Sequence, residues 1–190
     1  HDLSVGSNDI TITVTAANGD NQDYTITVVR QDKEPDPKPE PDPEPDVAYP
    51  GFSTTLSVDE DEKYISGLTV SDYVQDVLDK IDNYNGAYSK ILNKNGNEKD
   101  GLVSTGDILI TYNSSGEEVS RYEIVIYGDV NGDGEIDLFD FAQIKRSILG
   151  IADPSGVYWK AADCNRDGEL DLFDFAKVKR YILVIGSINQ

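Results

Sequence analysis

The chain of 190 residues contains no methionine, one cysteine and one histidine. A single cysteine excludes a disulfide bond within the chain. The histidine is His1, so the rest of the sequence offers no residue for a Ser-His-Asp triad, a Cys-His pair or a histidine-containing zinc site. We therefore do not expect this chain to be an enzyme. Paired carboxylates of the glycosidase kind are the alternative, but the calcium loops and the linker described below account for every dense carboxylate cluster. Cys164 is expected to be a small buried apolar side chain.

Basic residues and long apolar runs are also scarce. The 16 Lys and Arg residues are outnumbered by 36 Asp and Glu residues, which gives a formal net charge of −20 at pH 7. This charge argues against nucleic acid and anionic membranes as partners. No apolar run is long enough to span a bilayer, so we also expect no membrane insertion.

A twelve-residue pattern occurs twice near the C-terminus, as DVNGDGEIDLFD and, 34 residues later, as DCNRDGELDLFD. Each copy has oxygen-bearing side chains at positions 1, 3, 5, 9 and 12 and glycine at position 6, which suits Ca²⁺. Position 7 supplies a peptide carbonyl, and position 9 ligates directly or through a water. We predict that the chain binds two Ca²⁺ ions, with the ligands Asp129, Asn131, Asp133, Glu135, Asp137, Asp140, Asp163, Asn165, Asp167, Glu169, Asp171 and Asp174.

These ions are predicted to be structural rather than regulatory. The segment before the first loop, RYEIVIYG, alternates like a strand, and GVYWKAA before the second is too short for a good helix. A calcium sensor places a helix on both sides of each loop and exposes a methionine-rich groove. Because the carboxylates of each loop repel one another without a cation, folding is expected to depend on calcium. The alternative is a pair of ordinary solvated acidic loops.

Each loop runs into a predicted helix, LFDFAQIKRSILG and LFDFAKVKRYILV. Helical spacing predicts a shared core, made of Phe141, Ile144, Ile148, Phe175, Val178 and Ile182, with Ile136 and Leu170 from the loops.

The other face of each helix combines apolar and basic residues, which we call the apolar-basic strip. Such a mixture is found at the centre of protein interfaces. Alternatively, Leu138 and Phe139 pack under the neighbouring loop and the Lys-Arg pair is merely solvated. The two strips consist of Leu138, Phe139, Ala142, Lys145, Arg146 and Leu149, and of Leu172, Phe173, Ala176, Lys179, Arg180 and Leu183.

The tandem loop-helix repeats over residues 127–188 resemble a type I-like dockerin, an all-α module that docks secreted enzymes onto cohesin domains. The resemblance implies a non-catalytic, extracellular chain that is monomeric when free, and a parent protein that degrades polysaccharides in a cellulosome-like assembly. Loop positions 10 and 11, often Ser-Thr in that family, are Leu-Phe in both copies, which suggests a more apolar contact. The near-identity of the repeats suggests that the partner binds in two orientations related by about a half-turn.

The chain upstream is predicted to contain three further parts. Residues 1–31 read as a β-hairpin with a turn at Asn18-Gly19, similar to the closing hairpin of a cadherin-like β-sandwich, and we expect the chain to be the C-terminal piece of a larger protein. Residues 32–47 form an acidic, proline-rich linker. Residues 48–127 are expected to be an α+β domain, with one helix, capped by Thr69 and carrying Val70 to Ile81, on a mostly antiparallel sheet.

The predicted fold class is therefore multidomain: hairpin remnant, linker, α+β spacer, and a dockerin over residues 128–190. Two other functions were considered. The chain could be a calcium-stabilised structural cap whose strips are covered by the preceding domain. Alternatively, residues 48–127 could bind carbohydrate through exposed aromatics such as Tyr84 and Tyr88.

Overall fold

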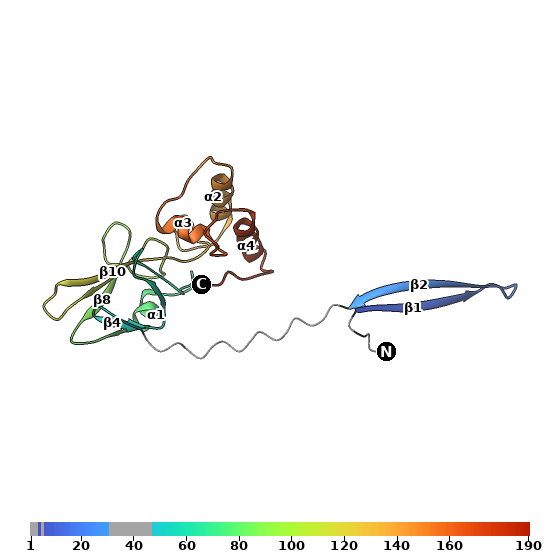
Figure 1. Cartoon of the computed structure of the whole chain (residues 1–190), viewed down its shortest axis with the longest axis horizontal. Coiled ribbons are helices and arrows are strands. Elements are labelled where there is room, and N and C mark those ends of the chain that lie inside the picture. Colours follow the sequence, from blue (N-terminus) through green and yellow to red (C-terminus); the bar gives the residue numbers. More distant parts are fainter. Residues whose placement is uncertain (1–3, 5, 31–46) are drawn as a thin grey trace. The chain divides into compact units, whose positions relative to one another are not determined.

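A computed structural model describes residue 4 and residues 6–30 and 47–190. The described residues belong to two compact units, His1–Pro43 and Glu44–Gln190, which are drawn in Figure 1. Residues 32–46 of the linker predicted over residues 32–47 lie outside the described residues, whereas Val47 does not belong to a linker but begins a strand. Each unit is described by itself.

The first unit contains the predicted hairpin. Strand β1 (Gly6–Thr15) pairs antiparallel with β2 (Asn21–Arg30), with Ile10 opposite Ile26. Gly19 adopts a φ of +91° in the turn between them, a conformation that favours glycine. Alternating apolar side chains share one face of this hairpin, and five of them are each 45–57% exposed: Ile10, Ile12, Val14, Tyr24 and Ile26.

The second unit begins with two small sheets. The larger one has the strand order β5 (Ser57–Asp59), β6 (Tyr64–Ser66), β10 (Glu118–Ile124), β9 (Ile108–Tyr112) and β8 (Tyr88–Leu92). The smaller one has the order β3 (Val47–Tyr49), β4 (Phe52–Thr54) and β7 (Ile81–Asn83). All pairings are antiparallel except that between β10 and β6. The prediction of a single sheet is therefore wrong, since the run from Phe52 to Val58 divides between the two sheets.

The helix of this region is shorter than the sequence pattern predicts. Helix α1 spans Val74–Leu78, and the carboxylate of Asp76 accepts a hydrogen bond of 2.8 Å from the Tyr73 N–H at its start. Thr69 does not cap this helix; its hydroxyl donates instead to Asp72. The predicted helix fails at both ends because Tyr73 forms a β-bridge with Leu102 and Ile81 enters strand β7.

Three helices follow in residues 128–190: α2 (Leu138–Ile148), α3 (Val157–Ala162) and α4 (Leu172–Ile182). The two helices predicted after the loops are confirmed as α2 and α4. A short helix, α3, also forms just before the second loop. The sequence analysis expected no good helix there, and this expectation is wrong.

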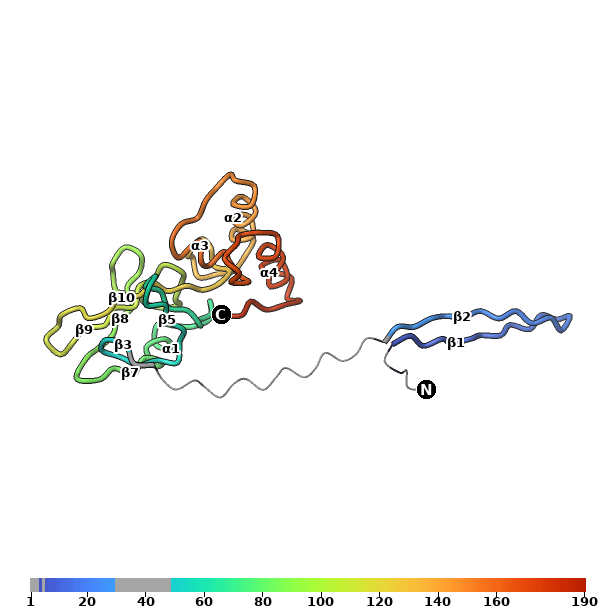
Figure 2. The backbone as a smooth tube through the Cα atoms, viewed as in Figure 1, coloured from blue at the N-terminus to red at the C-terminus, as the bar shows by residue number. Residues whose placement is uncertain are grey.

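The second unit contains two hydrophobic cores, and the chain after β10 contributes side chains to both. Figure 2 shows the backbone of this segment as it leads from β10 to the helices. Ile124 and Ile126 are buried in the core of the sheets, whereas Val125 and Tyr127 are buried in the core of the helices. Side chains of an extended chain point alternately to opposite sides, so one short segment joins both cores. All eight residues predicted for the helical core either belong to it or pack against it. Cys164 is buried in this core, as expected.

In the described part of the chain, no helix is both long and apolar enough to cross a membrane.

Candidate calcium loops and interaction surface

The first loop folds around its own carboxylates. One oxygen of Asp140 accepts hydrogen bonds from the amides of Val130 and Asn131, at 2.8 and 3.1 Å. Its other oxygen accepts from the Asp137 amide at 2.9 Å. Asp129 Oδ1 accepts from Gly132 and Asp133 at 2.9 and 3.2 Å. The last predicted ligand, Asp140, thus accepts from the amide of the residue that follows the first, Asp129.

The second loop repeats most of this pattern, although the glycine that bonds its first aspartate is at position 6 and not at position 4. Asp174 accepts from the amides of Asn165 and Asp171, at 3.1 and 2.9 Å. Asp163 accepts from Asp167 and Gly168, at 3.2 and 2.9 Å. The same twelve-residue spacing therefore produces nearly the same loop twice.

The aspartate at position 9 of each loop also caps the N-terminus of the following helix. Asp137 accepts a hydrogen bond of 2.7 Å from the Phe139 amide, and Asp171 accepts the same bond from Phe173. A carboxylate at this N-cap position stabilises a helix by satisfying an unpaired amide. Because a carboxylate has two oxygens, it can cap the helix and still contribute to a cation site.

Four of the predicted ligands are buried carboxylates: Asp129, Asp140, Asp163 and Asp174. Among the described residues, none of the four forms an ion pair with Lys or Arg. Burial raises the pKa of Asp129 to about 6, with a further contribution from the nearby Asp140 and Asp133 charges. Burial likewise raises the pKa values of Asp140 and Asp174.

Buried carboxylates that repel one another are stabilised either by protonation or by a compensating cation. In the described part of the chain, Asp, Glu, His and Cys side chains do not form a group of three that could by themselves hold a metal ion. The predicted set, however, also draws on the side-chain oxygens of Asn131 and Asn165 and on a peptide carbonyl in each loop. All of these are hard oxygen donors, so their chemistry fits Ca²⁺.

The two apolar-basic strips are exposed. Leu138 and Phe139 are 67% and 71% exposed, and Leu172 and Phe173 are 68% and 70% exposed. This finding excludes the alternative in which Leu138 and Phe139 pack under the neighbouring loop. The other strip residues are exposed as well, namely Ala142, Lys145, Arg146, Leu149, Ala176, Lys179, Arg180 and Leu183.

Further exposed apolar side chains follow each helix, and the sequence analysis did not identify them. Ile151 is 63% exposed after α2, and Val184 and Ile185 are 90% and 64% exposed after α4. The sequence could have identified them, because they are apolar residues that directly follow each predicted helix. A groove joins the start of α2 to the end of α4, lined by Leu138, Phe139, Ala142, Tyr181, Ile182 and Val184 among others.

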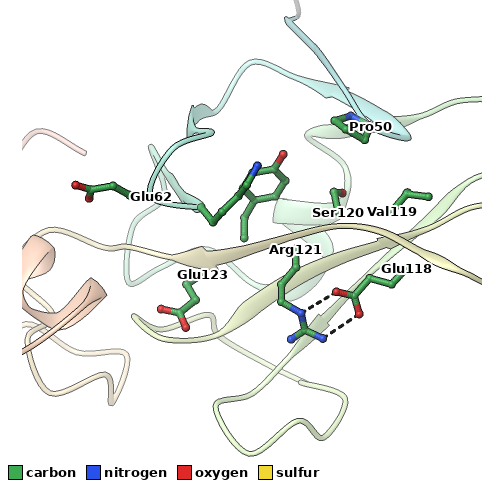
Figure 3. A pocket seen from close by; sticks show the side chains of 9 residues that line it. Pro50, Glu62, Glu118, Val119, Ser120, Arg121 and Glu123 are labelled. Carbon is green, nitrogen blue, oxygen red and sulfur yellow. Dashed lines mark hydrogen bonds and ion pairs between the residues drawn. The ribbon is translucent and has the colours of Figure 1, made fainter.

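A different pocket lies beside β10, and Figure 3 shows its side chains. Arg121 donates two hydrogen bonds to Glu118, at 2.8 and 3.0 Å, so its charge is already paired. The aromatic ring in its lining, Tyr122, is 1% exposed and offers no stacking face. Tyr88, proposed above as a carbohydrate contact, stacks on Tyr112 with centroids 5.2 Å apart. Tyr84 and Tyr88 are 37% and 44% exposed, so carbohydrate binding through residues 48–127 stays a prediction.

Residues 127–183 match the family model described as the dockerin type I domain. Dockerin domains of that family are non-catalytic modules that bind calcium and cohesin domains. No curated protein and no solved structure matches the chain.

Proposed function

We propose that residues 128–190 form a calcium-dependent docking module that binds a cohesin domain of a scaffold or cell-surface protein. The observation that carries this proposal is the exposure of the same apolar-basic strip on α2 and α4. Large apolar side chains beside arginine typically dominate binding energy when they are buried by a partner. The match of residues 127–183 to the dockerin model gives the class of partner.

The calcium part of the proposal assigns one Ca²⁺ to each loop, with the twelve ligands predicted above. It is supported by the burial of four carboxylates and by the equivalent hydrogen bonds of the two loops. When bound, the ions neutralise the loop carboxylates and hold the start of each helix. The partner-binding strips begin at these helix starts, so we expect docking to require calcium.

The partner is proposed to bind in two orientations, through either strip, because six of six strip positions are identical in the two repeats. The contact residues are the twelve residues of the apolar-basic strips. The chain is proposed to be monomeric when free and to bind neither nucleic acid nor membrane.

For the remaining parts we propose a hairpin of the β-sandwich kind (residues 1–31), an acidic linker that ends before Val47 and an α+β spacer that ends at residue 127. The exposed apolar face of the hairpin supports the first assignment, since a two-stranded hairpin is marginally stable alone. The parent protein is proposed to be secreted and to degrade polysaccharides within a cellulosome-like assembly. The chain itself is proposed to be non-catalytic.

Titration calorimetry against a panel of cohesin domains, with calcium and with excess chelator, tests the proposal. Binding that requires calcium supports a docking module. Calcium-induced folding without binding to any cohesin would refute it and favour the structural cap. A structural cap would also require residues 47–127 to cover the strips. The strips are exposed in the structure although residues 47–127 are present.

A further inference from the structure

The first calcium loop differs from the second in what surrounds it. The segment Val103–Asp107, which precedes β9 in the sheet region, lies against loop 1. The amide of Thr105 donates a buried hydrogen bond of 2.8 Å to Asp129 Oδ2. In loop 2 the equivalent oxygen, Asp163 Oδ2, accepts from Gly168 of its own loop at 2.9 Å. The same carboxylate oxygen of the first aspartate thus has a donor outside its loop in one repeat and a donor inside its loop in the other.

Thr105 is held in place by its side chain. Its hydroxyl donates to the Ile126 carbonyl at 3.2 Å, and it accepts from the Ile126 amide at 3.1 Å. Thr105 itself is 1% exposed. Two neighbouring bonds keep the segment rigid, since Asp107 accepts from the Ser104 amide at 2.8 Å and pairs with Lys99 at 2.9 Å. The amide that faces Asp129 therefore has a fixed position.

The difference between the two loops is also visible in the sequence, at loop position 4. Gly132 (φ +68°) and Arg166 (φ +61°) share a left-handed backbone conformation. A Cβ added at Gly132 would lie 2.5 Å from the Thr105 carbonyl oxygen and 2.8 Å from the Tyr158 ring. In loop 2 the Arg166 guanidinium instead lies over the Tyr127 ring, 5.2 Å from its centroid. Loop 1 has glycine because the Thr105 segment occupies the space of a side chain.

We propose that the segment Val103–Asp107 is an integral part of the first calcium site, with the Thr105 amide as the group that positions the ligand Asp129. This inference rests on the calcium sites of the proposed function. By holding Oδ2, Thr105 leaves Oδ1 directed at the loop interior, where the amides of Gly132 and Asp133 already approach it. Loop 1 therefore has a preorganised first ligand, and preorganisation strengthens binding.

Two consequences follow for calcium. Loop 1 should bind Ca²⁺ about tenfold more tightly than loop 2, as expected for one extra fixed hydrogen bond to a charged ligand. In addition, filling loop 1 should protect the Thr105 and Ile126 amides from hydrogen exchange, because the ion and the Thr105 segment hold the same carboxylate. Filling loop 2 should leave these two amides unchanged.

The test is a calcium titration of the full chain followed by NMR, in which the Gly134 and Gly168 amides report loops 1 and 2 separately. Gly132→Ala and Arg166→Ala form a matched pair, with the same residue at position 4 of each loop. We expect Gly132→Ala to weaken loop 1 by about tenfold and to change loop 2 less than twofold. Arg166→Ala should leave the affinity of loop 1 unchanged.

Thr105→Val and Thr105→Ser provide a second comparison. Valine removes the hydroxyl that anchors Thr105 to Ile126 and should weaken loop 1 severalfold, whereas serine keeps the hydroxyl and should preserve the affinity. Equal affinities of the two loops, with no effect of Gly132→Ala or Thr105→Val, would overturn the inference while leaving both calcium sites in place. A titration in which neither glycine amide responds to calcium would overturn the calcium sites and the inference together.

Discussion

The rings of Phe141 and Phe175 stack on each other, with centroids 4.2 Å apart and planes inclined by 25°. These two residues are equivalent positions of the two repeats, 34 residues apart. Contact between equivalent residues is expected across an approximate two-fold axis. The pair therefore joins α2 to α4 and fixes how the two strips are presented.

Replacing Phe141 by alanine should lower the free energy of unfolding by about 2–3 kcal/mol in calcium, since it removes the stack and part of the helical core. Thermal denaturation measures this change. Phe139→Ala is the control: it is the same substitution two residues away on the same helix, at a side chain that is 71% exposed. It should change stability by less than about 0.5 kcal/mol. Equal losses in both variants would contradict the assignment of core and surface.

Partner binding should tolerate damage to one strip but not to both. The double variant Phe139→Ala with Arg146→Ala should keep most of the affinity, because the intact strip on α4 can replace the damaged one. Adding Phe173→Ala and Arg180→Ala should cost about 2 kcal/mol or more per anchor. Calorimetry with a cohesin that binds the unmodified chain measures both. Abolition of binding by the first pair alone would disprove the two-orientation proposal.

Calcium binding should weaken on acidification. Since the folded pKa of Asp129 is about 6, above its ordinary value of 3.8, most of this carboxyl carries a proton at pH 5 in the calcium-free protein. Protons and calcium compete for the same oxygens, so affinity should fall by about tenfold between pH 7.5 and pH 5. Calorimetry at the two pH values checks this expectation.

Without calcium, the thermal stability of the protein should increase on acidification. A group whose pKa is raised on folding stabilises the fold below its unfolded pKa, and this contribution is lost as pH rises through the folded value. In chelator, the midpoint of thermal unfolding should therefore increase as the pH is lowered from 7 towards 5. A calcium-induced rise in the midpoint that is equal at both pH values would contradict the assignment of the buried carboxylates.

The last residues of the chain should contribute to stability. Ile188 is 6% exposed in the helical core, and the Gln190 side chain accepts from the Tyr127 amide at 2.8 Å and donates to its carbonyl at 3.0 Å. Ile188→Ala should cost about 2–4 kcal/mol. The adjacent Asn189 is exposed, so Asn189→Ala is a suitable control and should have little effect. Denaturant unfolding compares the two; similar midpoints would argue against the docking of this tail.

The repeats were predictable because their determinants are local. The ligand spacing, the glycine at position 6 and the helical period all lie within about 20 residues of each other, and Ile144 and Val178 are fully buried as predicted. The exposure of Phe139 and Phe173 also follows from helical spacing alone. Local patterns thus sufficed for α2, α4 and their core, but not for the short helix α3.

The sheet region was less predictable because its strands are short and pair over long distances. Strand β6 has three residues, no clear alternation, and a partner, β10, more than fifty residues away. The predicted helix lost Ile81 to strand β7 for the same reason. The bond between Thr105 and Asp129 could not be read from spacing either, although the difference between Gly132 and Arg166 was a visible sign of it.

Strand β10 lies between β6 and β9 and continues into the first loop without a linker. A tension that enters through docked helices therefore reaches the sheet along the axis of this strand. The backbone hydrogen bonds of β10 to β9 run across that axis, so the pull loads them simultaneously in shear instead of peeling them apart in sequence. A force applied through α2 and α4 would therefore be resisted by all the β10–β9 hydrogen bonds together.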